Sequence, residues 1–328
     1  MSRSLELTTN EKNFLHTALK NNLRLNGRTP TQLRPINIEL SPSEYGYVEV
    51  SLGSSKISVR ISAQIVKPYE DRPFEGIFVI NSEISPMASL KFDTTRAQQQ
   101  DEILISRIIE KSIRRSNALD LENLCIVAGE KCWEIVADLN FWNYDGNFVD
   151  LGCFATMLAL SHFKKPDISI GSSGGGGGGG NRIVVHDFNE RQPVGLSILH
   201  VPICLTYSFY NLSSKEVNIK GGDVVEEESG DASSEWDANE VCLLDADAVE
   251  ETFRDGSITI TLNKNREIIQ LSKNGGVPID AQQLIELCYS SMSHIDKLTD
   301  LIKTKIKEDE ARRYQLENFK LLESSADR

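Results

Sequence analysis

The hydrophobic period of this chain changes near residue 30, and that change constrains its fold more than any other feature. Residues 9–22 carry apolar side chains at helical spacing behind the capping-box pattern Thr8-x-x-Glu11. Between residues 36 and 85, apolar and polar residues alternate instead, in the segments "INIEL", "YVEVSLG", "SKISVRISAQIV" and "GIFVINSEIS". We therefore predict a first helix over 9–22 and then four strands of a mixed or antiparallel sheet.

A similar order of elements returns farther along the chain. We predict a two-faced helix over 101–116, two strands within 124–142 and a small-residue helix over 148–162. Beyond residue 191, the strand segments are "LSILHVPICLTYSFYN", "SITITLN" and "EIIQLSK", and a long helix follows from residue 280. This order predicts an α+β fold with two α/β subdomains, each with a mixed sheet packed against helices, plus an N-terminal and a long C-terminal helix.

The segment limits follow from these elements. We predict an N-terminal helix and turn over 1–30, a first subdomain over 31–190, a second over 191–308 and a charged tail over 309–328. The glycine-rich segment 171–181 has no side chains to pack, so we expect a flexible hairpin extension there. Residues 213–240 are polar and acidic, and we predict a disordered surface loop.

The net charge of −13 is unevenly distributed along the 328 residues. Residues 213–251 hold 13 Asp or Glu and 2 Lys or Arg, which leaves 35 acidic and 33 basic residues elsewhere. A nearly neutral body with one acidic segment can still present a local basic surface to phosphates. The net charge therefore does not exclude nucleic acid as a partner.

The cysteines and histidines give no metal-site pattern. None of the six cysteines forms a CxxC pair, and the five histidines lack metal-ligand spacing, so we expect reduced thiols in an intracellular protein and no zinc. The sequence contains no apolar run of 18 residues and no hydrophobic N-terminal core region. We therefore predict no membrane span, no signal peptide, no metal and no cofactor.

The predicted helix over 101–116 carries a basic face. Arg107, Lys111, Arg114 and Arg115 follow one another at i, i+4, i+7 and i+8, opposed only by Glu110. One interpretation is a solvated face that forms ion pairs with neighbouring acids. The other is a stripe that contacts phosphates, for which the planar guanidinium group is well suited.

Two further groups of residues could carry chemistry. In "LDADAVEETF", Asp245 and Glu251 lie six residues apart across a turn and could share a divalent cation, although a solvated acidic loop fits equally well. In "NYDGNFVDLGCFATMLAL", Asp145 and Gly146 precede a helix whose free N–H groups form a potential anion site. The alternative for this second group is a turn with only a structural role.

Several segments resemble the RNase PH family of 3′-to-5′ phosphorolytic exoribonucleases. "RLNGR" resembles the Arg-x-Asp-Gly-Arg opening of that family, with Asn26 in place of Asp. "GYVEVSLGSSKISVRIS" resembles its early strand pair, and "RIIEKSIRR" resembles its Arg-x-x-x-Arg-x-x-Arg helix at Arg107, Lys111 and Arg114. The resemblance covers about residues 20–300 and implies an RNase PH-like fold. Longer segments such as "LCIVAGEKCWEIVADLNFWNYDGNFVD" resemble, more narrowly, a ring subunit of the eukaryotic RNA exosome.

The differences from that family concern activity. Active members have Asp-Gly-Gly-Thr-Arg at the turn, where the Thr-Arg pair holds phosphate, whereas Phe148 and Val149 follow Asn147 here. The resemblance also matches Asp245 and Glu251 to a metal-binding pair of acids. Because phosphorolysis requires phosphate to be held in line with the scissile bond, we predict that Asp145, Gly146, Phe148, Val149, Asp245 and Glu251 are vestigial and that the chain has no catalytic residue.

By resemblance, we expect a non-catalytic structural subunit of the exosome core ring that helps form the channel threading RNA for 3′-to-5′ processing and degradation, including rRNA maturation. The expected partners are other RNase PH-like ring subunits, cap subunits with KH and RNA-binding barrel domains, a hydrolytic 3′-to-5′ ribonuclease, and RNA, but no membrane. The expected location is the nucleus, including the nucleolus, and the cytoplasm. Two alternatives are an active phosphate-dependent 3′-to-5′ exoribonuclease, and a scaffold whose basic helix contacts neighbouring subunits and not RNA.

Overall fold

The computed structural model describes residues 8–92, 95–171, 182–188, 190–211, 240–276 and 278–326. Its largest sheet has the strand order β1-β2-β3-β6-β4, and β5 pairs with the end of β6. Only the β4–β6 pair is parallel, so the sheet is mixed, which is one of the two predicted alternatives. Its strands are β1 (Ile36–Leu40), β2 (Tyr47–Leu52), β3 (Ser55–Val66), β4 (Ile77–Ile84), β5 (Cys125–Val127) and β6 (Lys131–Asn143).

A second sheet of four antiparallel strands has the order β12-β11-β13-β14. Every residue of β13 is buried, which is expected for a strand covered on both faces. Its strands are β11 (Ile203–Asn211), β12 (Glu240–Leu244), β13 (Gly256–Leu262) and β14 (Ile268–Gly275). The remaining strands form two small pairs, β7 (Lys164–Lys165) with β10 (Val194–Gly195) and β8 (Ile168–Gly171) with β9 (Arg182–Val185).

Helix α3 (Phe148–His162) joins the two sheets, since it packs against β2 and β3 of the first and β11 of the second. Thirteen of its 15 residues are buried, and Gly152 lies so close to Phe141 and Ile109 that a Cβ there would meet both side chains. Helix α2 (Thr95–Ile113) packs on α3 and β4. One continuous hydrophobic cluster therefore includes both sheets and these helices.

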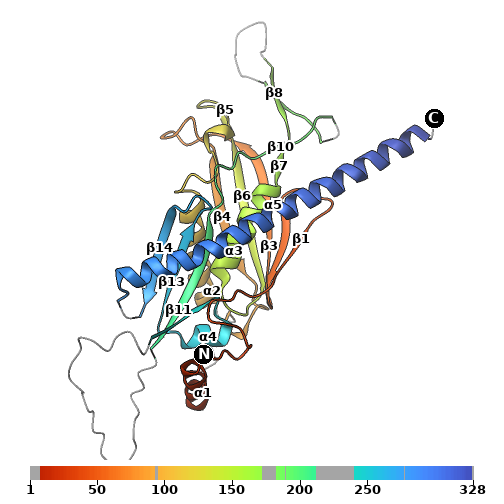
Figure 1. Cartoon of the computed structure of the whole chain (residues 1–328). Coiled ribbons are helices and arrows are strands. Elements are labelled where there is room, and N and C mark those ends of the chain that lie inside the picture. Colours follow the sequence, from red (N-terminus) through yellow and green to blue (C-terminus); the bar gives the residue numbers. More distant parts are fainter. Residues whose placement is uncertain are drawn as a thin grey trace, which may run out of the picture.

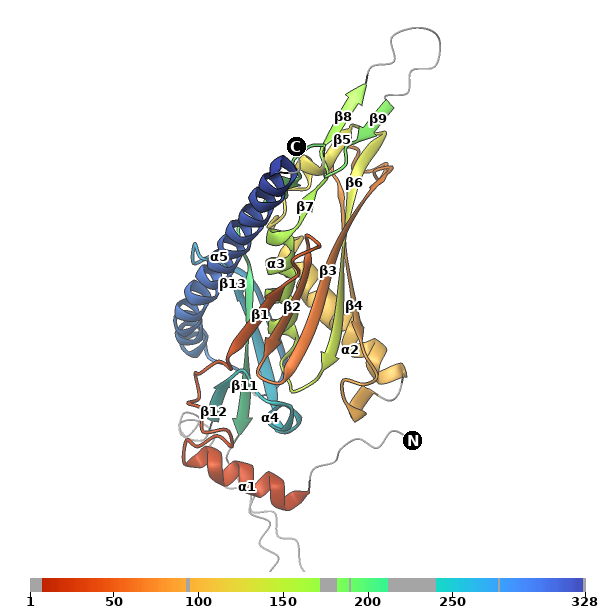
Figure 2. The ribbon, with the colours of Figure 1, turned by 90° about the vertical axis from the view of Figure 1, so that its right-hand side faces the viewer.

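The C-terminal helix α5 (Ala281–Ala326) packs on β11 and β13, and its last part projects beyond the sheets (Figure 1). At the opposite end from the β8–β9 hairpin, α1 (Thr9–Lys20) lies beside α4 (Ala248–Phe253) (Figure 2). There Leu19 packs with Tyr210 and Leu243 in a small separate cluster. None of the helices in the described ranges is long and apolar enough to cross a membrane.

The observed elements differ from the predicted ones in several places. Helix α2 runs from Thr95 to Ile113, so Arg114 and Arg115 lie in the turn after the helix. Strand β12 was not predicted, because its residues follow an acidic segment that conceals the short apolar run. Helix α5 continues through the expected charged tail to Ala326, and Asp309 at the start of that tail is buried.

The β8–β9 pair confirms the predicted hairpin around the glycine-rich segment, but the tip over 172–181 lies outside the described residues. Residues 213–239 of the predicted acidic loop also lie outside the described residues. The subdomain limits stay a prediction.

Candidate functional site

The segment between α1 and β1 carries arginines that turn toward the loop between β12 and α4. Arg24 forms a two-point ion pair with Glu250, with Nε–Oε1 at 3.0 Å and Nη2–Oε2 at 2.5 Å. It also donates to the main-chain carbonyls of Leu244 and Asp245. Both charged side chains are at most 2 % exposed, so this pair is part of the protein interior. Removal of one partner would leave a buried charge without compensation.

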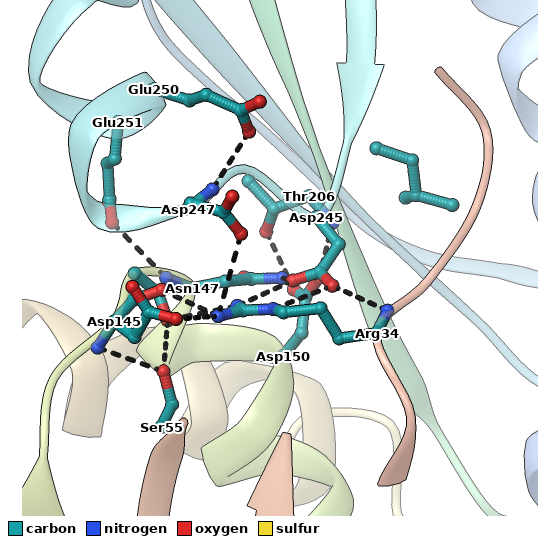
Figure 3. A network of polar contacts seen from close by, with 12 residues as sticks. Arg34, Ser55, Asp145, Asn147, Asp150, Thr206, Asp245, Asp247, Glu250 and Glu251 are labelled. Carbon is teal, nitrogen blue, oxygen red and sulfur yellow. Dashed lines mark hydrogen bonds and ion pairs between the residues drawn. The ribbon is translucent and has the colours of Figure 1, made fainter. Parts of the chain in front are cut away.

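Arg34 occupies the centre of the site (Figure 3). Its Nε and Nη2 donate to the two carboxylate oxygens of Asp245 at 3.0 and 2.8 Å, and its main-chain N–H donates to Asp245 at 2.9 Å. Its Nη1 and Nη2 also donate to the carbonyl oxygens of Asp145 and Gly146. One guanidinium group thus connects the entry to β1, the turn before α3 and the loop before α4.

Arg28 and Asn26 complete the contact between the N-terminal segment and α4. Arg28 lies 2.5 Å from the Asp247 carboxylate and 3.2 Å from that of Asp245, and Asn26 donates its amide to Asp247. Asp247 is also the N-cap of α4 in a capping box with Glu250. The "RLNGR" segment is therefore bound to the second sheet.

These contacts act on the pKa values of the site. Burial alone would raise the pKa of Asp245, but the hydrogen bonds and charge of Arg34 outweigh it and lower the pKa. Burial would lower the pKa of Arg34, and Asp245 reverses this, so that both groups keep their charges. Burial, and then the charge of Glu250, raise the pKa of Asp247 despite the nearby Arg28. The charge of Arg34 is therefore compensated within the site by the charge of Asp245.

The turn before α3 is pressed against the loop before α4. Gly146 has φ +82°, and a Cβ at this position would lie 2.6 Å from the Ala246 carbonyl oxygen and 2.8 Å from the Ala248 nitrogen. Asn147 follows with φ 58°, in the left-handed region. The Ser55 hydroxyl accepts from the Asp145 main-chain N–H at 3.0 Å and donates to the Gly146 carbonyl at 2.9 Å. The backbones of the two loops are thus in direct contact.

A second buried carboxylate links α3 to the second sheet. Asp150 accepts hydrogen bonds from the Thr206 main-chain N–H at 2.7 Å, the Thr206 hydroxyl at 2.6 Å and the Asn147 amide at 2.9 Å. Burial raises its pKa to about 7, against the opposing effect of these bonds. The Asn147 amide also donates to Asp245 at 2.9 Å, so this residue bridges the two carboxylates.

Glu251 lies at the N-terminus of α3. Its carboxylate accepts the Asn147 main-chain N–H at 3.2 Å and the Tyr144 hydroxyl at 2.8 Å, and it pairs with Arg254 at 2.9 Å. The amide of the predicted anion site is therefore bound to a carboxylate of the chain itself.

The structure brings together only part of the residues expected at this site. Asp145, Gly146, Asp245 and Glu251 lie in one polar network, whereas Phe148 and Val149 turn away from it. Phe148 is 5 % exposed and packs with the rings of Phe92, Phe141 and Tyr144. Val149 packs against the hydrophobic core.

The predicted basic surface lies on a different part of the molecule. Arg107 lines a cleft of about 330 Å³ together with Ser82, Glu102 and Ser106, and none of these residues borders the network. Arg114 pairs with Glu110 at 3.0 Å. Among the described residues, Arg107, Lys111 and Arg115 form no ion pair.

A divalent cation does not fit the pair Asp245 and Glu251. The Asp245 carboxylate is fully buried and already bonded to Arg34, Arg28 and Asn147. The Glu251 carboxylate is already bonded to the Tyr144 hydroxyl and the Asn147 main-chain N–H, in the turn before α3. Within the described residues, no group of three or more His, Cys, Asp or Glu side chains could hold a metal ion.

The sequence interpretation did not identify Arg34, Ser55, Asn147, Asp150 or Thr206. Asn147 lies in the turn that resembles the family motif, but the other four lie in no recognisable motif, and each of the five has a partner that is distant along the chain. One indirect signal exists: four acids within 245–251 require bases from elsewhere in the chain, and three arginines lie close together at positions 24, 28 and 34.

Two family models match this chain. The model described as "3' exoribonuclease family, domain 1" matches residues 32–166, and that described as "3' exoribonuclease family, domain 2" matches residues 237–292. Together they cover more than half of the sequence. The chain belongs to the 3′ exoribonuclease (RNase PH) family. The matched ranges contain the first large sheet, α3, both loops of the polar network and three strands of the second sheet (β12, β13 and β14), whereas β11 lies between the two ranges.

Curated relatives in this family cover almost the whole chain. The Saccharomyces cerevisiae protein named "Exosome complex component RRP45" is 48 % identical over 95 % of this chain and 95 % of its own length. The Schizosaccharomyces pombe protein named "Exosome complex component rrp45" is 41 % identical over 94 % of both. The human protein named "Exosome complex component RRP45" is 31 % identical, and the match covers 98 % of this chain and 65 % of that protein.

Solved structures confirm the predicted RNase PH-like fold. A chain from a structure titled "archaeoglobus fulgidus exosome with RNA bound to the active site" superposes with a TM-score of 0.67 at 24 % identity. The superposition covers 88 % of this chain and 96 % of that one. At this level of identity, the superposition shows a shared fold and nothing more.

Proposed function

We propose that this chain is a structural subunit of an RNA exosome core ring and that it does not catalyse phosphorolysis. The similarity to the yeast relative over nearly the full length of both proteins carries the proposal. Its partners would be other RNase PH-like ring subunits, cap subunits with KH and barrel domains, and a hydrolytic 3′-to-5′ ribonuclease. Its location would be that of RNA processing in the nucleus, the nucleolus and the cytoplasm.

The charges of the site support the absence of catalysis. Phosphorolysis requires a cation and donors that are free to hold inorganic phosphate. Arg24, Arg28 and Arg34 are each paired with a carboxylate, at 2.5 to 3.2 Å. Together with the contact between the two loops, this pairing leaves the guanidinium groups no unshared charge for a phosphate.

A phosphorolysis assay decides between this proposal and an active exoribonuclease. Purified chain is incubated with single-stranded RNA, magnesium and inorganic phosphate, and the release of nucleoside diphosphates is measured. We expect none above a protein-free control. Release of nucleoside diphosphates that depends on inorganic phosphate would favour the active enzyme.

Native mass spectrometry of a tagged chain purified from cells tests the assembly. We expect the chain in a complex with several different RNase PH-like subunits. A homohexamer or a free monomer as the main species would contradict the ring role.

The basic surface is the proposed place of RNA contact, through phosphates and hence with little dependence on sequence. We predict that Arg107→Glu with Lys111→Glu weakens RNA protection by a reconstituted ring, since both cations lack an ion pair among the described residues. The effect should be about tenfold in RNA affinity at low salt and smaller at high salt. Arg114→Glu, whose side chain already pairs with Glu110, serves as the comparison and should have less effect. Unchanged protection with an intact ring would instead support the scaffold without RNA contact.

A further inference from the structure

Two cysteines lie directly opposite each other on neighbouring strands of the first sheet, far from the polar network. Cys125 is the first residue of β5, Cys132 is the second residue of β6, and the antiparallel register pairs the two residues. Side chains of directly paired residues point to the same face of a sheet. Their Cα atoms are about 4.5–5.5 Å apart in such pairs, which lies within the range of about 4.4–6.8 Å found for disulfide bonds. Both thiols are free in the structure.

The two thiols differ in their access to solvent. Cys125 is half-buried, and its thiol donates only a long bond of 3.9 Å to the carbonyl of Pro73. Cys132 is 0 % exposed, and burial raises the pKa of its thiol. Since oxidation by a peroxide requires a thiolate that solvent can reach, Cys125 is the thiol that a peroxide attacks first. Cys132 then lies beside the oxidised sulfur.

A second pair of cysteines shows that proximity alone does not select a redox site. Cys153 on α3 and Cys204 on β11 have thiols that are hydrogen-bonded to each other. They are 0 % and 1 % exposed, and both belong to the continuous hydrophobic cluster. A peroxide has no route to this pair in the folded state, so we expect both thiols to stay reduced.

We propose that Cys125 and Cys132 form a reversible disulfide bond when the chain reacts with a peroxide. In the first step, the Cys125 thiolate attacks one oxygen of hydrogen peroxide, the O–O bond breaks, and the other oxygen takes up protons and leaves as water. The product is a sulfenic acid. In the second step, the Cys132 sulfur attacks the Cys125 sulfur, its proton passes to the sulfenic oxygen, and this oxygen leaves as water. Two thiols and one hydrogen peroxide thus give one disulfide and two waters, and a dithiol reverses the reaction.

The bond has a local consequence for the fold. Strand β5 has three residues and, among the described strands, pairs only with β6. A register shift lies between Cys125 and Val127, so this short ladder is a part of the sheet that should open easily. The hairpin also holds the loop before β4, because the Gly129 main-chain N–H donates to the Pro73 carbonyl at 2.9 Å. A covalent link between β5 and β6 should therefore slow the opening of the hairpin.

The test treats the purified full-length chain with hydrogen peroxide and maps its peptides by mass spectrometry without reduction. We expect one linked pair, Cys125 with Cys132, which dithiothreitol returns to two thiols. Cys125→Ser should abolish the link. Cys132→Ala should also abolish it and leave Cys125 as a sulfenic acid that dimedone traps. Cys288→Ala, which removes an unrelated thiol from α5, should leave the link unchanged.

Hydrogen exchange of the amides of residues 126–131 measures the consequence. Exchange should be about tenfold slower in the oxidised wild type than in the reduced wild type, and peroxide should not slow it in Cys125→Ser. Because Cys125 is half-buried, this variant keeps the test valid if Cys132→Ala does not fold. The inference is overturned if peroxide links a different pair, if the two thiols persist or reach the sulfonic acid without linking, or if exchange is equal in both states. None of these outcomes depends on the proposed function.

Discussion

At the scale of single residues, Arg34 shows how an arginine that could bind an anion can instead bind carboxylate and carbonyl groups of the same chain. Arg34 satisfies both oxygens of Asp245 and two main-chain carbonyls at once, which only a planar guanidinium group can do. Because both partners are buried, neither charge can be removed alone without a large cost. The same side chain that could have bound phosphate therefore stabilises the fold.

We predict that Arg34→Lys lowers the free energy of unfolding by about 3 kcal/mol, because an ammonium group cannot replace the two-point bond to Asp245. Urea denaturation followed by circular dichroism measures the change. Arg60→Ala, which breaks the exposed pair with Glu44, is the control and should cost less than about 1 kcal/mol. Equal costs for the two variants would show that the Arg34 contacts do not stabilise the chain.

Gly146→Ala should be destabilising by about 3 kcal/mol, because the added Cβ meets the Ala246 carbonyl at 2.6 Å in addition to the strain of a positive φ. Gly129→Ala separates the two effects, since Gly129 has φ +73° and nothing within 4 Å of an added Cβ. This control should cost only about 1 kcal/mol. Thermal unfolding of both variants tests the contact between the two loops, which a similar loss in each would contradict.

At the scale of elements, a buried cluster holds the C-terminal part of α5 against the first sheet. Asp309 pairs with Arg313 at 2.6 Å and accepts from His162 Nε2 at 3.2 Å, while His162 Nδ1 accepts the Gly46 main-chain N–H at 3.1 Å. Burial lowers the pKa of His162, so the neutral ring with its proton on Nε2 is favoured. Arg313 also donates to the carbonyls of the loop after β1.

We predict that Arg313→Ala lowers the hydrogen-exchange protection of α5 amides beyond residue 305 by about tenfold, because charge-assisted bonds of about 1.5–3 kcal/mol each are lost. Arg312→Ala is a matched control, since Arg312 contacts the same Asp309 carboxylate but its side chain is 53 % exposed. It should change protection much less. If the two variants behaved alike, the cluster would not anchor the helix.

At the scale of the whole molecule, α3 and its carboxylates connect the two large sheets. Asp150 extends from α3 to Thr206 on β11, and Asn147 connects it to Asp245 at the start of the loop before α4. The polar network is therefore part of the joint between the two sheets, beside a continuous apolar core. A substitution that weakens the polar network should therefore destabilise both sheets together.

The pH dependence of stability should report on Asp150. Its folded pKa of about 7 lies above the unfolded value, so between about pH 4 and 7 the folded state holds a proton that the unfolded state has lost. The free energy of unfolding should therefore fall as pH rises through this window. Asp150→Asn should reduce this slope, as measured by urea denaturation at several pH values, and an unchanged slope would assign it to other groups. Asp245 has a lowered pKa, so its contribution is present at neutral pH and is lost below about pH 4.

The sequence by itself determined the elements. Period-two alternation over 36–85 gave four strands at nearly the observed limits, and the capping box at Thr8 gave the start of α1, because both signals depend on neighbours within a few residues. The family motifs then determined the RNase PH-like fold and the place of the two loops. The segment 240–244 was missed, since an isolated short strand has almost no local signal.

Only the tertiary structure decided what the site residues do. Arg34 and Asp245 are separated by 211 residues and Arg24 and Glu250 by 226, so no spacing rule relates them. The sequence places Phe148 after Asn147 in the turn, but only the folded structure shows that its ring packs with Phe92, Phe141 and Tyr144. Burial, charge pairing and loop contact arise from parts of the chain that meet only on folding. They give the turn before α3 its structural role, which is to bind the loop before α4.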